Sequence, residues 1–306
     1  MTNISTIQQN SQMLQILQQL GNKASTLESQ ISTGQKSTSF SGVAPQAAKL
    51  VDLAATQSQQ QGYIDTITTV NTRVQTMSLA MQNIATVAST LQTQLSNNAF
   101  SSTGAGIQST AQQLLVEVGS YLNTQDGSRF VFSGNKTTTP SYDPTNLPTP
   151  GDLTTNISAD YYNGDTAVSQ ATVDSNVTVK YGVTGDNPAF EQIIRVLNFF
   201  ANNSTPLSQT SATDVANVQK GQQMLAQAVQ QVQQLVATSG EQQQSLTQLS
   251  AAHKNALTLA STTSNNVLQI DSATAITQLN TLQTQLQASY QTMNILQNLS
   301  LVNYLK

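Results

Sequence analysis

Two stretches at opposite ends of the chain carry apolar or small residues at alternating steps of four and three. The first runs through Met13, Leu17, Leu20, Ala24, Leu27 and Ile31, and its helix is expected to end at Gly34. The second runs through Ala275, Leu279, Leu282, Leu286, Ser289, Met293, Leu296 and Ser300. This spacing is typical of the contact face of a coiled coil. Either helix alone would leave apolar surface in water, so the two are expected to pair.

The larger side chains on these two faces are the candidate assembly residues of the chain. We call them the terminal seam, which consists of Met13, Leu17, Leu20, Leu27, Ile31, Leu279, Leu282, Leu286, Met293 and Leu296. A face this wide can also contact copies of the same protein. The sequence therefore predicts self-association through the seam.

Helical periodicity returns in the interior of the chain. It runs from about residue 45 to 95, from 107 to 122, from 189 onward, and almost unbroken from 215 to the end. A Ser/Gly-rich loop is expected over 97–106.

The middle of the chain has a different pattern. An Asp126-Gly127 turn signal precedes an alternating stretch at 129–133, which predicts a strand or hairpin. A proline-rich loop follows at 137–152, and alternation resumes imperfectly at 173–183. These features predict a small β-rich insertion.

The expected fold is mainly α, a long antiparallel helical bundle or coiled coil of the N- and C-terminal segments with a small β-rich domain inserted in the middle. Three domains are expected. Residues 1–40 with 265–306 form the terminal coiled coil, 41–137 with 190–264 form a helical bundle with a β-hairpin, and 138–189 form the outer insertion.

The low content of charged residues, the net charge and the absence of cysteine limit the classes of function that the sequence supports. Only 8% of the 306 residues are charged, and neutral polar residues can be packed closely without desolvating charges. A net charge of -4 with scattered Lys and Arg argues against nucleic-acid binding. Cysteine is absent, no segment is apolar enough to span a membrane, and the N-terminus lacks the pattern of a cleaved signal peptide.

The supply of catalytic side chains is small. His253 is the only histidine, so a His or Cys metal site has no second ligand, and a packed or surface position is expected for it. Seven Asp residues between 126 and 186 lie beside turn-forming residues, and the spacing of a calcium loop is missing. We expect no enzyme activity, no metal and no cofactor.

Three segments resemble bacterial flagellins and flagellar hook-filament junction proteins, the hook-associated protein 3 type. The first is Gln30-Ile31-Ser32-Thr33-Gly34-Gln35-Lys36. The second and more specific is Asn123-Thr124-Gln125-Asp126-Gly127-Ser128-Arg129-Phe130-Val131-Phe132-Ser133-Gly134-Asn135-Lys136-Thr137. The third is the final stretch from Gln287-Ala288-Ser289-Tyr290-Gln291 to Leu299-Ser300-Leu301-Val302-Asn303-Tyr304-Leu305. One departure is the segment 37–45, which lacks the two carboxylates common in the family after the first helix.

The resemblance implies a structural subunit of the extracellular bacterial flagellum that serves motility and is exported without a cleaved signal peptide. Its partners would be copies of itself, other axial proteins such as hook-associated proteins and flagellin, the flagellar export apparatus and an export chaperone. It implies neither nucleic acid nor membrane as a partner.

The sequence leaves several alternative functions open. Within the family, the chain could be a junction protein, which the middle motif and the ending favour, or the filament flagellin itself. A more distant alternative is a surface adhesin or carbohydrate-binding module, with Tyr142, Tyr161 and Tyr162 as stacking platforms. The sequence has no pair of carboxylates at a recognisable spacing to support a cell-wall hydrolase.

Overall fold

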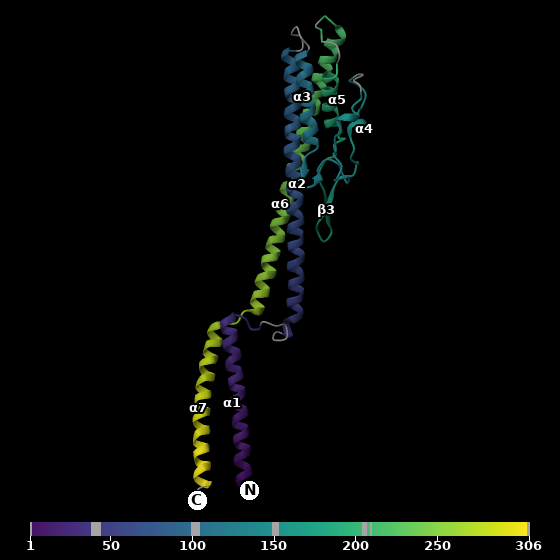
Figure 1. Cartoon of the computed structure of the whole chain (residues 1–306). Coiled ribbons are helices and arrows are strands. Elements are labelled where there is room, and N and C mark those ends of the chain that lie inside the picture. Colours follow the sequence, from purple (N-terminus) through teal and green to yellow (C-terminus); the bar gives the residue numbers. More distant parts are fainter. Residues whose placement is uncertain are drawn as a thin grey trace. The chain divides into compact units, whose positions relative to one another are not determined.

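The computed structural model describes residues 2–37, 44–98, 105–148, 153–203, 207–208 and 210–304. These ranges leave out most of segment 37–45, which differs from the family pattern, as well as the centre of the predicted loop 97–106 and Leu305. The elements, shown in Figure 1, are α1 (Thr2–Thr33), α2 (Ala47–Asn98), α3 (Ala105–Leu122), β1 (Gln125–Asp126), β2 (Arg129–Phe130), η2 (Pro144–Asn146), α4 (Ser158–Tyr161), β3 (Gln170–Asp174), β4 (Val177–Lys180), α5 (Pro188–Ala201), α6 (Ala212–Leu268) and α7 (Ser272–Tyr304).

Long helices dominate these elements, and the strands form two separate two-stranded antiparallel sheets, β1–β2 and β3–β4. The predicted mainly α class with a small β region is therefore confirmed. The chain divides into two units, Met1–Gln59 with Ala256–Lys306, and Gln60–Asn255.

The first unit contains the antiparallel pair of α1 and α7, whose chain termini lie at the same end of the pair (Figure 1). At its other end the backbone is tied together. Gly34 has a φ of +69° and ends α1 as predicted, and its carbonyl accepts from the Ile270 N–H at 3.1 Å. The Lys36 N–H donates to the Leu268 carbonyl at 2.7 Å.

The run from 215 to the end, predicted to be almost unbroken, is interrupted at residues 269–271, which separate α6 from α7. Gln269 forms a β-bridge with Gln35, which takes its backbone out of the helix. Asp271 then starts α7, since its Oδ1 accepts from the Ala273 N–H at 3.1 Å and its Oδ2 from the Thr274 hydroxyl at 2.7 Å. These hydrogen bonds lower the pKa of the Asp271 carboxyl.

The second unit is built on α2, α3, α5 and α6. Their apolar faces form one continuous core, in which Met81, Leu91, Val118, Ile193 and Leu225 are almost fully buried. Residues of the middle segment, among them Phe132 and Tyr161, complete this core. Phe132 meets Phe190 of α5 edge to face, with 5.7 Å between the ring centroids.

A second, smaller core fixes the β3–β4 hairpin on the long helices. Val173 and Tyr181 pack with Ile67, Val70 and Val74 of α2, and with Leu246 of α6. The predicted strand at 129–133 is shorter than expected, because only Arg129 and Phe130 pair with β1. The following residues turn inward, and Phe132 and Ser133 are fully buried.

Candidate functional site

The structure brings the two halves of the terminal seam onto the paired helices α1 and α7. Leu17 is 7% exposed, and the other nine residues of the seam are half-buried. The small residues at the same period, Ala24 and Ala275, are 8% and 2% exposed. The four-three period therefore marks the less exposed face of both helices.

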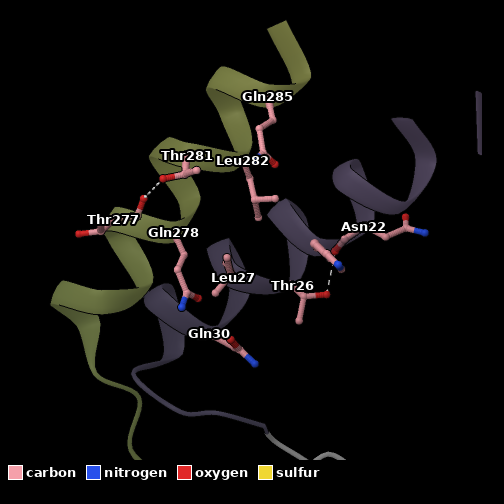
Figure 2. A pocket seen from close by; sticks show the side chains of 10 residues that line it. Asn22, Thr26, Leu27, Gln30, Thr277, Gln278, Thr281, Leu282 and Gln285 are labelled. Carbon is pink, nitrogen blue, oxygen red and sulfur yellow. Dashed lines mark hydrogen bonds between the residues drawn. The ribbon is translucent and has the colours of Figure 1, made fainter. Parts of the chain in front are cut away.

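An open groove of about 620 Å³ runs along one side of this pair (Figure 2). Leu27 and Leu282 point into the space between the two helices. The remaining lining residues are polar, and only Lys23 is charged: Asn22, Lys23, Thr26, Gln30, Thr277, Gln278, Thr281 and Gln285. The groove thus combines an apolar floor with a rim of hydrogen-bonding groups, of which Lys23 alone is charged.

The threonine hydroxyls of the rim are already satisfied inside their own helices. Thr26 donates to the Asn22 carbonyl at 2.8 Å, and Thr281 donates to the Thr277 carbonyl at 2.9 Å. The Gln30 amide donates to the Lys36 carbonyl at 2.6 Å. Covering the threonine hydroxyls and the Gln30 amide would therefore cost little hydrogen bonding, because these groups already have partners within the chain.

The outer faces of the two helices are also poor in charge. Between Ser272 and Tyr304, α7 contains no Asp, Glu, Lys or Arg, and the only charged residues of α1 are Lys23 and Glu28. Several large apolar side chains stand in water, with exposed fractions of 48% for Leu14 and Ile16 and 60% for Tyr290 and Ile295. A helix pair with this surface is suited to further packing rather than to solvation.

The described residues hold no group of three or more His, Cys, Asp or Glu side chains that could bind a metal. His253 is 5% exposed and packed inside the second unit, as expected from its sequence position. No helix within the described ranges has the length and apolarity needed to cross a membrane.

The tyrosines proposed as stacking platforms for a sugar belong to the core instead. Tyr142 is 4% exposed, Tyr161 is fully buried, and Tyr162 is half-buried with its hydroxyl donating to the Asp165 carbonyl at 2.7 Å. Burial raises the pKa of Tyr142 to about 12 and raises that of Tyr161 well above its ordinary value. The rings of Tyr142 and Tyr161 are covered by protein, so the structure contradicts a stacking role for these two residues.

Sequence reasoning missed two ionic contacts that hold the second unit together. Arg73 of α2 pairs with Asp126 of β1 at 3.0 Å and donates to the Tyr181 hydroxyl at 3.0 Å. Glu191 pairs with Arg195 at 3.1 Å, and it accepts from the Ile157 N–H at 3.0 Å. The four-residue spacing of Glu191 and Arg195 within α5 could have identified the second pair. No local pattern in the sequence links Arg73 to Asp126 or Tyr181, which lie 53 and 108 positions further along the chain.

Comparison with known proteins rests on structure. No protein-family model matches the sequence, and no curated protein matches it. A Vibrio parahaemolyticus protein described as a flagellar hook-associated protein superposes with a TM-score of 0.60 and 19% identity, over 74% of this chain and all of that one. The two chains share one fold. A superposition on Bacillus cereus FlgL has a TM-score of 0.40 at 13% identity, over 73% of this chain and 99% of that one.

Proposed function

We propose that this protein is a structural subunit of the extracellular bacterial flagellum, of the hook-filament junction type, and that it assembles through its paired terminal helices. The observation that carries the proposal is the fold shared with the Vibrio protein, together with the low charge of α1 and the absence of charged residues from α7. Its partners in this function are copies of itself, hook-associated proteins and flagellin. The flagellar export apparatus and an export chaperone would deliver it without a cleaved signal peptide.

The surface of the helix pair supports a role in assembly on energetic grounds. Bringing a charged side chain into an interface costs several kcal/mol unless it finds a partner. Neutral amides and hydroxyls need only hydrogen bonds, and the exposed apolar area gains about 25 cal/mol for each Å² covered. Because α7 has no charged residue and the groove lining has only one, covering these surfaces avoids most of the cost of desolvating charges. The gain from burying apolar area is retained.

Two segments favour the junction type over the filament flagellin. The Asn123 to Thr137 run resembles the junction proteins, and the Asn303-Tyr304-Leu305 ending also favours them. The main alternative is the filament flagellin, which would use the same terminal helices in a far longer polymer.

Electron microscopy of the purified full-length protein added to hook or filament seeds tests the proposal. A junction subunit extends a seed by a short layer and then stops. Long homopolymers would instead assign the chain to the filament, and a protein that never binds a seed would overturn the flagellar proposal altogether.

A substitution in the groove tests the assembly surface itself. Leu282→Lys places a charge beside Leu27 and is expected to reduce seed binding at least tenfold, since the ammonium would be desolvated in the contact. Leu282→Met is the matched control, because it keeps an apolar side chain of similar length and should bind as the wild type does. Circular dichroism checks that both variants keep their helices. Equal seed binding by the two variants would remove the groove from the assembly surface.

Deletion of residues 282–306 provides a coarser test. It removes most of α7 and therefore the partner of α1. The truncated protein is expected to stay soluble and to lose seed binding, and binding at the normal rate would contradict assembly through paired terminal helices.

A further inference from the structure

The chain's only Asn-Gly pair, Asn163-Gly164, lies in the middle segment shortly after α4. It connects the β-bridge of Tyr142 with Tyr162 to the contacts of Asp165, and both of its residues are half-buried. Asparagine is a chemically labile residue, and a following glycine hinders attack on its side chain least, because glycine has no side chain beside its backbone nitrogen. This pair is therefore the place where the chain is most open to reaction with itself.

The packing around the pair requires a glycine at position 164. A Cβ there would clash with the hydroxyl end of the Tyr162 ring. That ring cannot move easily, because its hydroxyl lies 2.7 Å from the Asp165 carbonyl oxygen and 3.1 Å from that of Phe132. The fold therefore excludes any side chain that would shield the Gly164 nitrogen.

The two reacting groups are held only weakly. Among the described residues, the Gly164 N–H has no hydrogen-bond acceptor. The Asn163 side-chain amide donates a long bond to Oδ2 of Asp143, at 3.5 Å, and an ionised carboxylate can only accept, so the amide nitrogen must face it. The Lys136 ammonium lies 3.4 Å from the Asn163 carbonyl oxygen, where a positive charge favours the deprotonated form of the adjoining Gly164 amide. The Gly164 nitrogen can therefore reach the Asn163 side chain without breaking a strong contact.

We propose that Asn163 is a self-modification site, at which the chain slowly converts its own asparagine to isoaspartate and aspartate. The Gly164 nitrogen attacks Cγ of Asn163 and gives up its proton to water, while the side-chain nitrogen takes up a proton from water and leaves as ammonia. A five-membered imide remains, and water opens it at either carbonyl. Opening at the side-chain carbonyl gives aspartate, whereas opening at the main-chain carbonyl gives isoaspartate, whose backbone is longer by a methylene. The net reaction consumes water and releases ammonia in equal amounts, without oxidation or reduction.

Both products place a second carboxylate beside Asp143. Hydrogen bonds from the Thr145 hydroxyl and N–H lower the pKa of the Asp143 carboxyl, so this group is ionised at neutral pH. The Asn163 amide now donates to it, and a carboxylate in the same place would repel it instead. Conversion therefore replaces a weak attraction by a repulsion between like charges.

The modified residue also belongs to a backbone pairing between two parts of the middle segment. The Asn163 N–H donates to the Ser141 carbonyl at 3.2 Å, and the Asp143 N–H donates to the Tyr161 carbonyl at 2.9 Å. The added methylene of isoaspartate would displace the chain that follows, where Oδ1 of Asp165 accepts backbone hydrogen bonds. Conversion is therefore expected to loosen this pairing, whichever function the protein has.

Peptide mapping by mass spectrometry of the purified full chain, stored at neutral pH, tests the modification. Replacement of the amide by a carboxyl group raises the mass of the peptide, and enzymatic methylation identifies isoaspartate. Asn176 is the internal control, since it is exposed in the β3–β4 turn but is followed by Val177. The β-branched follower hinders attack, so Asn163 is expected to convert at least about tenfold faster than Asn176. Equal rates at the two sites, or conversion of Asn163 only after unfolding in urea, would overturn the proposal.

Hydrogen exchange of the Asp143 amide tests the loosening. Its protection is expected to fall about tenfold in the stored chain, the loss of roughly one hydrogen bond. Asn163→Asp carries the charge from the start and should show the lower protection when freshly prepared; full protection in this variant would remove the charge from the mechanism. Asn163→Gln is the matched control, because its side chain would have to close a larger ring, and it should keep its protection on storage. Unchanged protection in the stored wild type, or the same fall in stored Asn163→Gln, would overturn the loosening, and circular dichroism checks that both variants keep their helices.

Discussion

Gly134 lies in the middle motif at a position where the structure leaves no room for a side chain. Its φ is +63°, in the left-handed region that favours glycine. A Cβ there would clash with Oδ1 of Asp165, and it would lie 2.5 Å from the Asp165 carbonyl oxygen and 3.0 Å from that of Ala167. Gly127, in the same motif, has a nearly equal φ of +62°, but a Cβ added there would meet nothing within 4 Å. Substituting alanine at Gly127 therefore measures backbone strain alone, whereas the same change at Gly134 measures strain together with steric crowding.

The cost of Gly134→Ala follows from what must move. The left-handed conformation costs an alanine about 1–2 kcal/mol, and Gly127→Ala should lose this amount alone. In Gly134→Ala, Asp165 must also shift, although its Oδ1 accepts from the N–H groups of Asn135 at 2.9 Å and Ala167 at 3.0 Å. Losing these charge-assisted bonds adds about 1.5–3 kcal/mol. The total loss is therefore about 2.5–5 kcal/mol.

Urea unfolding of both variants measures the difference. Helix content by far-UV circular dichroism gives the free energy of unfolding, and near-UV circular dichroism reports the packing of tyrosines, among them Tyr162, whose hydroxyl donates to the Asp165 carbonyl. Gly134→Ala is expected to be less stable than Gly127→Ala by about 1.5–3 kcal/mol, with a weaker near-UV signal. Equal losses in the two variants would refute the close approach of Asp165 to Gly134.

Two further predictions concern the core of the second unit. Burial raises the pKa of Glu191, although the Ile157 N–H and Arg195 oppose the shift, so folding favours its protonated form. As the pH rises from 4.5 through the raised pKa, the free energy of unfolding of the wild type should fall relative to that of Glu191→Gln; parallel urea-derived curves would contradict this. Ile193→Ala, at a fully buried site, should lose about 2–5 kcal/mol in urea unfolding, whereas Leu79→Ala, at a side chain 55% exposed, should lose under about 0.5 kcal/mol; similar losses would argue against the assigned core.

The helical framework could be predicted because long, regular periodicity is a local signal. The end of α1 at Gly34 and the mainly α class follow from spacing and one glycine. The break before α7 was missed because Gln269 leaves the helix through a bridge to Gln35, a contact between residues far apart in sequence. Asp271, with Thr274 three residues later, was the available local sign of a new helix start.

The middle segment was harder to predict because tertiary contacts decide its conformation. The alternation at 129–133 indicated a strand, but Phe132 and Ser133 leave it to enter the core, where the Ser133 hydroxyl donates to the Thr139 carbonyl at 2.7 Å. Nothing in the local pattern distinguishes a buried turn from a strand of the same polarity. The burial of Tyr142 and Tyr161 could not be predicted from the local pattern for the same reason, since burial depends on partners elsewhere in the chain.

The distribution of charge relates the fold to the proposed function. In the second unit, charged side chains take part in folding: Arg73 joins α2 to β1 and the end of the hairpin, and Glu191 joins α5 to the backbone at Ile157. On α7 there are no charged side chains, although a solvated helix gains solubility from them at little cost. A helix that stays in water has no physical reason to exclude charge over 33 residues, whereas a helix to be covered by other subunits does. This contrast supports the assignment of assembly to the terminal helices and of internal stability to the ionic contacts of the second unit.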